Sequence, residues 1–205
     1  SDGICHQLMT EAGYVKPGNI VFGTDSHTTT YGCVGAFSSG IGYTEMASIL
    51  GTGTMWIKVP ETIKVVIEGE LPGNVMSKDI ILRLIGDLGA DGATYRALEF
   101  TGSTVKNMTV ASRMTMANMA IEAGAKNGIF IVDDQTRAYM DAHSDKQYTA
   151  YEPDEDAEYD QVVEIDLSEV RPTVAFPHLP GNAKTIDEVE TMEPIKIDQV
   201  VIGSC

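Results

Sequence analysis

The stretch "IVFGTDSHTTT", residues 20–30, joins a short apolar run to a glycine and then to a dense group of polar side chains. The β-branched and aromatic run predicts a buried strand. Asp25, Ser26 and His27 follow it, so an acid, a hydroxyl and an imidazole stand where the strand ends. In open α/β sheets, ligands bind outside the carboxyl ends of the strands. The stretch therefore predicts an α/β fold with a proton-handling site at this strand end.

A second apolar run with a polar ending, "VVIGSC" at residues 200–205, closes the chain on Cys205. We expect this run to form a strand and to bring Cys205 to the same crevice. A lone cysteine is more often a small buried apolar side chain than a ligand, so both interpretations of Cys205 stay open.

Strand and helix patterns alternate along the rest of the chain, which indicates the α/β class. Strands are expected at residues 61–71, 97–102, 128–133 and 161–167. Helices are expected near residues 1–15, 44–50, 77–89 and 109–125, with N-caps at Thr44, Ser77 and Thr109. The glycine-rich residues 32–43 and the proline-broken residues 171–189 are expected to be loops. Changes of character near residues 58–60 and 141–160 predict domain boundaries.

The net charge of −16 over 205 residues disfavours nucleic acid and anionic membrane surfaces as partners, since both require a basic surface. No apolar run approaches the roughly 18–20 residues of a membrane span, and no secretory signal is visible. The acidic residues 151–160 match no calcium-loop spacing and are interpreted as a solvated loop. Three cysteines without a CxxC pair favour a reducing, cytoplasmic location. Both ends look cut, so we expect a piece of a longer protein.

The expected helix 109–125 carries Asn118 and Glu122, which are four residues apart and therefore on one face. A carboxylate among alanines, methionines and an isoleucine needs a cationic or hydrogen-bonding partner. Each polar residue also has a structural interpretation: His6 and His27 as core histidines, Asp25 as a turn residue, and Asn118 and Glu122 as an ordinary polar face. Ser26 beside a histidine suggests a hydrolase, but the chain has no G-x-S-x-G turn.

Several motifs taken together resemble the aconitase superfamily, and within it the branch of 3-isopropylmalate dehydratase large subunits and homoaconitases. They are His6-Gln7, "GTDSHT", "GIGYTE", "WIKVP", "DGATYRALEFTG", "ANMAIEAGA" and the terminal "IGSC". The resemblance covers nearly the whole chain. It implies three-layer α/β/α domains with mixed sheets: residues 1–60 would end a first domain, residues 61–150 would form a second, and residues 151–205 would start a third.

The resemblance also implies a [4Fe–4S] cluster with an incomplete ligand set in this chain. Cys205 matches the first cluster cysteine, and the family's other two ligands, a C-x-x-C pair, lie beyond it. His27 would contact the substrate hydroxyl and pair with Glu122, and Asp25 would pair with His6. Ser26 would line the site, and Asn118 would form a hydrogen bond near the cluster.

The implied activity is a hydro-lyase reaction in leucine biosynthesis, the reversible dehydration and rehydration that interconverts 3-isopropylmalate and 2-isopropylmalate. The implied partners are a hydroxy-di- or tricarboxylic acid and a small, swivelling-domain subunit. Homoaconitate or another alkylmalate is the alternative substrate. Two further alternatives are a mononuclear metal hydrolase that uses His6, Asp25 and His27, and a binding module without catalysis.

Overall fold

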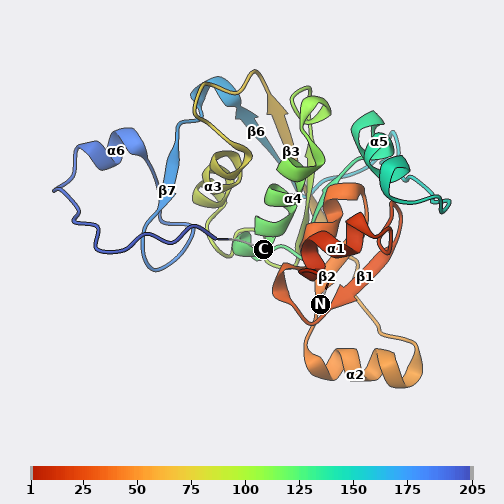
Figure 1. Cartoon of the computed structure of the whole chain (residues 1–205). Coiled ribbons are helices and arrows are strands. Elements are labelled where there is room, and N and C mark those ends of the chain that lie inside the picture. The colour runs from red at the N-terminus through yellow and green to blue at the C-terminus, as the bar shows by residue number, and fades with distance from the viewer. Residues whose placement is uncertain (1, 204–205) are drawn as a thin grey trace.

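The computed structural model of the chain describes residues 2–203, and its centre is a four-stranded parallel sheet with the order β5-β4-β3-β6 (Figure 1). The strands are β3 (Glu61–Glu68), β4 (Arg96–Thr101), β5 (Asn127–Phe130) and β6 (Gln161–Asp166). Helices α3 (Ser77–Leu88) and α4 (Val110–Met119) connect β3 to β4 and β4 to β5. Successive parallel strands need such crossovers, so the predicted α/β class is confirmed.

Alternation along β3 buries one face of this sheet. Ile63, Val65 and Ile67 are fully buried, while the residues between them are half-exposed. The buried face belongs to one apolar cluster with the inward residues of α3 and α4, and the rings of Phe100 and Phe130 stack at 4.8 Å on neighbouring strands. Burial of this strand face with the two helices therefore contributes to the apolar core of the fold.

The opposite face of the sheet is polar and carries the end of the acidic loop. The Tyr159 hydroxyl donates to Glu99 at 2.9 Å, and the Lys64 ammonium lies 4.7 Å from the Tyr159 ring centroid. Burial, together with its Glu99 partner, raises the pKa of Tyr159 to about 12. Residues 151–158 are exposed and without regular structure, which confirms the predicted solvated loop. Among residues 2–203, this sheet thus has helices on one face and a loop on the other.

The N-terminal part of the chain surrounds a two-stranded parallel sheet of β1 (Ile20–Gly23) and β2 (Phe37–Gly40). The 3-10 helix η1 (Ser26–Val34) connects them and is buried from Thr28 onward, packed against α4 and β5. A Cβ on Gly32 would lie only 1.9 Å from the Gly128 carbonyl oxygen, so the backbones of η1 and β5 are in direct contact. α1 (Cys5–Glu11) packs on η1.

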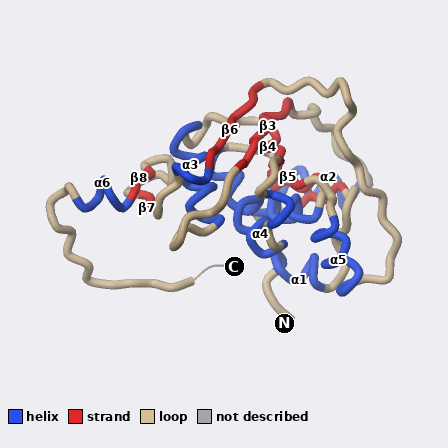
Figure 2. Tube along the Cα trace, turned by 90° about the horizontal axis from the view of Figure 1, so that it is seen from above, coloured by secondary structure: helices blue, strands red, loops and turns tan. Residues whose placement is uncertain are grey.

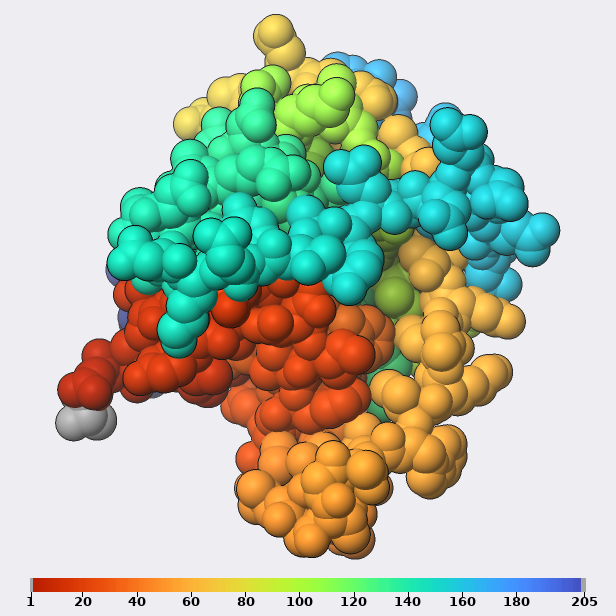
Figure 3. Space-filling model, turned by 90° about the vertical axis from the view of Figure 1, so that its right-hand side faces the viewer, coloured from red at the N-terminus to blue at the C-terminus, as the bar shows by residue number. Residues whose placement is uncertain are grey.

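Helix α2 (Tyr43–Thr52) projects from this body and has no buried residue; Figure 3 shows it as a separate orange lobe. Its N-cap is Gly42, not the predicted Thr44, and it ends at Gly53. The N-cap of α3 is likewise Met76, not Ser77, because the Asp79 carboxylate accepts the Met76 amide at 2.7 Å.

Elements that local patterns did not predict are β2 and α5 (Asp134–His143), together with the hairpin β7 (Thr173–Ala175)–β8 (Ala183–Thr185) and α6 (Ile186–Glu190). Helix 109–125 is shorter than predicted: α4 ends at Met119, the 3-10 turn η3 (Ala120–Ala123) follows, and Gly124 ends it in a left-handed conformation. Each described sheet is purely parallel or purely antiparallel, so parallel and antiparallel pairing mix between sheets and not within one.

The predicted strand at residues 200–202 is wrong. Val200, Val201 and Ile202 are 76%, 80% and 98% exposed and lie in an extended coil that joins no sheet (Figure 2). β-branched residues stabilise a strand only where a neighbouring strand pairs with their backbone, and the part of the chain described supplies none here. Cys205, and with it the predicted shared crevice, lies outside the described residues. Within those residues, no helix is both long and apolar enough to cross a membrane.

Candidate active site

The turn after β1 positions the first group of predicted residues. Asp25 is the N-cap of η1, and its carboxylate accepts the backbone amide of His27 at 2.8 Å. The Thr28 hydroxyl donates to the Asp25 carbonyl oxygen at 2.7 Å. Such side-chain capping is typical of aspartate at a helix start, and here it fixes where the His27 ring emerges.

His6 from α1 reaches the same carboxylate. Its Nε2 lies 2.8 Å from Asp25 Oδ1, and its side chain is 8% exposed against 51% for Asp25. Partial burial raises the pKa of Asp25, but the hydrogen bonds from His6 and the His27 amide outweigh it, so the pKa is lowered. An ionised carboxylate only accepts, so His6 Nε2 carries the proton. Its Nδ1 is buried and has no partner among residues 2–203.

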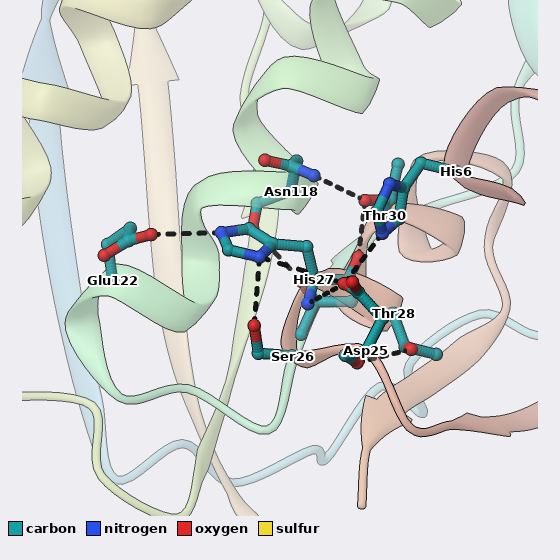
Figure 4. Close-up of polar contacts among 9 residues, drawn as sticks. His6, Asp25, Ser26, His27, Thr28, Thr30, Asn118 and Glu122 are labelled. Atoms are coloured by element: carbon teal, nitrogen blue, oxygen red, sulfur yellow. Dashed lines mark hydrogen bonds and ion pairs between the residues drawn. The ribbon is translucent and has the colours of Figure 1, made fainter. Parts of the chain in front are cut away.

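His27 forms the second imidazole–carboxylate pair, with Glu122 on η3 (Figure 4). His27 Nε2 lies 3.0 Å from Glu122 Oε1, and His27 Nδ1 lies 3.1 Å from the Ser26 hydroxyl. With Glu122 ionised, Nε2–H donates to it, and Nδ1 becomes the atom that can accept or release a proton. The pairings His6–Asp25 and His27–Glu122, predicted from the resemblance, are thus both present in the geometry.

Asn118 lies on α4 one turn before Glu122 and is held by η1. Its side-chain Nδ2 donates to the Thr30 hydroxyl at 2.9 Å, and its backbone carbonyl accepts the Thr29 hydroxyl at 3.2 Å. The two contacts connect residues that are far apart in the chain, with sequence separations of 88 and 89.

Four of the predicted residues, His6, His27, Asn118 and Glu122, line one cavity of about 750 Å³. Its lining comes from one face of α4 and the turn after it, from α1, η1 and the start of α3, and from Tyr139 of α5. Asp25 and Ser26 do not line it; Ser26 faces a neighbouring cavity of about 480 Å³. Residues that were not among the predicted site residues also line the larger cavity: Gln7, Glu11, Thr30, Met76, Ser77, Lys78, Ala111, Met114, Thr115, Met119 and Tyr139. The spacing of Ala111, Met114, Asn118 and Glu122 was the available signal for the α4 members.

The described residues do not contain a complete metal-binding group. Among residues 2–203, no three His, Cys, Asp or Glu side chains are grouped to hold a metal ion. Cys33 is fully buried, and burial raises the pKa of its thiol to about 12, which opposes the thiolate that a metal needs. Cys5 is exposed. Each of the two imidazoles is bonded to a carboxylate through Nε2, which fixes one ring nitrogen and leaves Nδ1 for other chemistry.

Comparison with known proteins gives the family. Residues 1–205 match the Aconitase family (aconitate hydratase) over their whole length. The chain belongs to the aconitase family. The resemblance inferred from the motifs is therefore confirmed, while the role of each site residue stays a prediction.

Curated relatives agree in their names. The chain is 58% identical over 203 residues to a "3-isopropylmalate dehydratase large subunit" of Caldicellulosiruptor bescii, a match that covers 99% of this chain and 47% of the relative. Identity is 59% over 204 residues to the protein of the same name from Acetivibrio thermocellus, and 57% over 203 residues to that from Clostridium kluyveri; each match covers 99% of this chain and 48% of the relative. The chain thus spans about half the length of the curated relatives it matches.

Proposed function

We propose that the protein containing this chain is an iron–sulfur hydro-lyase that interconverts 3-isopropylmalate and 2-isopropylmalate in leucine biosynthesis. The observation that carries the proposal is the linked pair of imidazole–carboxylate contacts beside the cavity. One hydrogen-bonded series connects four residues. The Asp25 carboxylate accepts from the His6 ring and from the His27 backbone amide, each at 2.8 Å, and the His27 ring contacts Glu122 at 3.0 Å. The names of relatives that are 57–59% identical support the same substrate class.

The reaction requires proton transfer at two adjacent carbons. In dehydration, a base from outside this chain takes a proton from one carbon, the neighbouring carbon loses its hydroxyl, and that hydroxyl needs a proton to leave as water. His27 Nδ1 is suited to supply this proton, because Glu122 holds Nε2 at 3.0 Å and the ring lines the cavity. In rehydration, the same nitrogen takes the proton back.

Ser26 also belongs to this part of the site. The Ser26 hydroxyl donates to Nδ1 in the neutral ring, so it keeps that nitrogen oriented until a ligand replaces it. A carboxylate on each imidazole fixes the tautomer and the orientation of the ring.

A [4Fe–4S] cluster, when bound, supplies a Lewis acid that weakens the bond to the departing hydroxyl. In this proposal Cys205 is its ligand from this chain, and two further cysteines come from the rest of the large subunit. A small subunit closes the site, and the three-domain division at residues 60 and 150 belongs to the same proposal. The free thiols of Cys5 and Cys33 support a reducing, cytoplasmic setting.

Homoaconitate or another alkylmalate remains the second candidate substrate, because the residues that select the alkyl group would come partly from outside this chain. The mononuclear hydrolase has less support, because no group of three His, Cys, Asp or Glu side chains that could hold a metal ion exists among residues 2–203.

The test uses the full-length large subunit with its small subunit, reconstituted without oxygen with iron and sulfide. 3-Isopropylmalate, homoisocitrate and citrate are added in turn, and the absorbance of the unsaturated acid is followed. We expect turnover of 3-isopropylmalate, lost in His27→Ala and in Cys205→Ser. Absence of turnover of all three acids, with the cluster assembled, would refute the hydro-lyase function; turnover of homoisocitrate alone would transfer the assignment to homoaconitase.

A further inference from the structure

We infer that Thr30 is a positioning residue: it sets the orientation of the Asn118 carboxamide, so that Asn118 presents its oxygen to the cavity and accepts the hydroxyl of a hydroxy-acid ligand. Thr30 is buried in η1, with 3% of its surface exposed. The inference rests on the proposed function for the identity of the ligand.

The direction of each hydrogen bond follows from donor counting. The Thr30 hydroxyl has one proton, and the His27 carbonyl oxygen, 2.6 Å away, can only accept it. Toward Asn118, the Thr30 oxygen therefore acts as acceptor, so the atom 2.9 Å from it must be the amide nitrogen Nδ2. With a flipped amide, the single Thr30 proton could go to Asn118 Oδ1 or to the His27 carbonyl oxygen but not to both, so one hydrogen bond would be lost at a cost of about 0.5–1.5 kcal/mol.

The amide oxygen is consequently fixed on the opposite side. Figure 4 shows Asn118 Oδ1 pointing away from Thr30, and no hydrogen bond to it occurs within residues 2–203. Asn118 lines the 750 Å³ cavity beside His27. The neighbouring Thr29 also holds the Asn118 backbone carbonyl at 3.2 Å, so the main chain and the side chain of this residue are both anchored by η1.

A fixed carbonyl oxygen selects the chemistry of the group that it meets. It attracts an O–H donor and repels a carboxylate, which presents only lone pairs. In a hydroxy-dicarboxylic acid, the group that fits is the hydroxyl. Asn118 Oδ1 would thus accept a hydrogen bond from the hydroxyl that the reaction removes. The His27 imidazole, which protonates this hydroxyl, lies beside it.

The test compares Thr30→Val, which has the same shape without the hydroxyl, with Thr30→Ser, which keeps it. Thr52→Val is the matched control, because Thr52 also bonds a main-chain carbonyl but lies exposed on α2, away from the cavity. The enzyme is the full-length large subunit with its small subunit. The probes are 2-isopropylmalate, measured by KM, and its deoxy analogue 2-isopropylsuccinate, measured by Ki.

We expect Thr30→Val to raise the KM for 2-isopropylmalate by about threefold to tenfold, the equivalent of one neutral hydrogen bond. The Ki of 2-isopropylsuccinate should stay within about twofold of the wild-type value. Thr30→Ser and Thr52→Val should match the wild type for both probes. If Thr30→Val raises the KM and the Ki equally, Thr30 has a general structural role. If it raises neither, the orientation of the Asn118 carboxamide does not affect binding. Each result overturns the inference.

A second readout does not depend on turnover. In the large subunit labelled with ¹⁵N-asparagine, the Asn118 side-chain signal is identified by its loss in Asn118→Asp. Its exchange with water should be slow in wild type and Thr30→Ser, and faster in Thr30→Val. Unchanged exchange in Thr30→Val would refute the orienting hydrogen bond. If the wild type does not turn over isopropylmalate, the proposed function fails, whereas the exchange rate still decides whether Thr30 orients Asn118.

Discussion

The buried Arg113 on α4 allows a stability prediction that can be worked through in detail. Its side chain is 0% exposed, and its guanidinium donates to the two oxygens of Asp133 at 2.8 and 2.6 Å. Two other contacts, to the Thr136 hydroxyl at 3.0 Å and the Val105 carbonyl at 2.9 Å, are to neutral groups. Asp133 is therefore the one carboxylate within residues 2–203 that pairs with this charge.

Asp133→Asn removes the counter-charge with little change of shape. Breaking a buried ion pair by deleting one partner typically costs about 3–5 kcal/mol. Asp133 is 25% exposed, so water can partly compensate, and we expect a loss near the lower end, about 3 kcal/mol. The asparagine can still cap α5 through Thr136, so little of this loss should come from the helix end.

Urea unfolding of the chain, followed by circular dichroism, measures the change. Adding Arg113→Met removes the stranded charge, so the double variant should regain at least about 1 kcal/mol over Asp133→Asn alone. A loss below about 1 kcal/mol in Asp133→Asn, or a double variant less stable than that single one, would refute an uncompensated buried charge as the cause.

Three further predictions concern the site and its support. Gly32→Ala should destabilise the chain by several kcal/mol, because the new Cβ would lie 1.9 Å from the Gly128 carbonyl oxygen. Gly51→Ala is the control: open space surrounds this position, so the change should be neutral or stabilising by up to about 1 kcal/mol. The denaturant midpoints of the two variants measure the difference. The pKa of Asp25 is lowered in the folded state, so its stabilising effect should be complete above the unfolded carboxyl pKa of about 3.9 and fade as the pH falls through the folded value. The stability difference between wild type and Asp25→Asn should therefore shrink below about pH 4, and a constant difference down to pH 2 would contradict this. Glu122→Gln should lower kcat by about 10- to 100-fold with an intact fold, measured in the reconstituted enzyme, and unchanged turnover would remove the Glu122 pair from the mechanism.

Local patterns predicted much of the fold, because the hydrophobic period is a property of neighbouring residues. β3 alternates in burial as its sequence alternates in polarity, and α4 begins at the predicted cap Thr109. The hairpin at residues 173–185 was not predicted because prolines and exposed polar residues interrupt its alternation. Helix α5 was not predicted because the expected domain boundary at residues 141–160 overlaps its C-terminal end.

The site itself shows the same division. The turn at residues 23–27 and the Asn118–Glu122 spacing identified polar groups without partners, and the motif resemblance named the pairs. Their geometry depends on contacts across 19, 88 and 95 residues of chain, which no local period encodes.

The class of fold, the strand end at which the polar residues gather and the family of the chain follow from the amino-acid order alone, since these depend on local order and motif identity. Three features are visible only in the folded chain: η1 is buried against α4, Thr30 holds the Asn118 amide, and the 200–202 run forms no strand. Those outcomes depend on which surfaces meet after folding: a threonine can orient an asparagine 88 residues away, and a strand can form, only when packing brings the partner backbone within hydrogen-bonding distance.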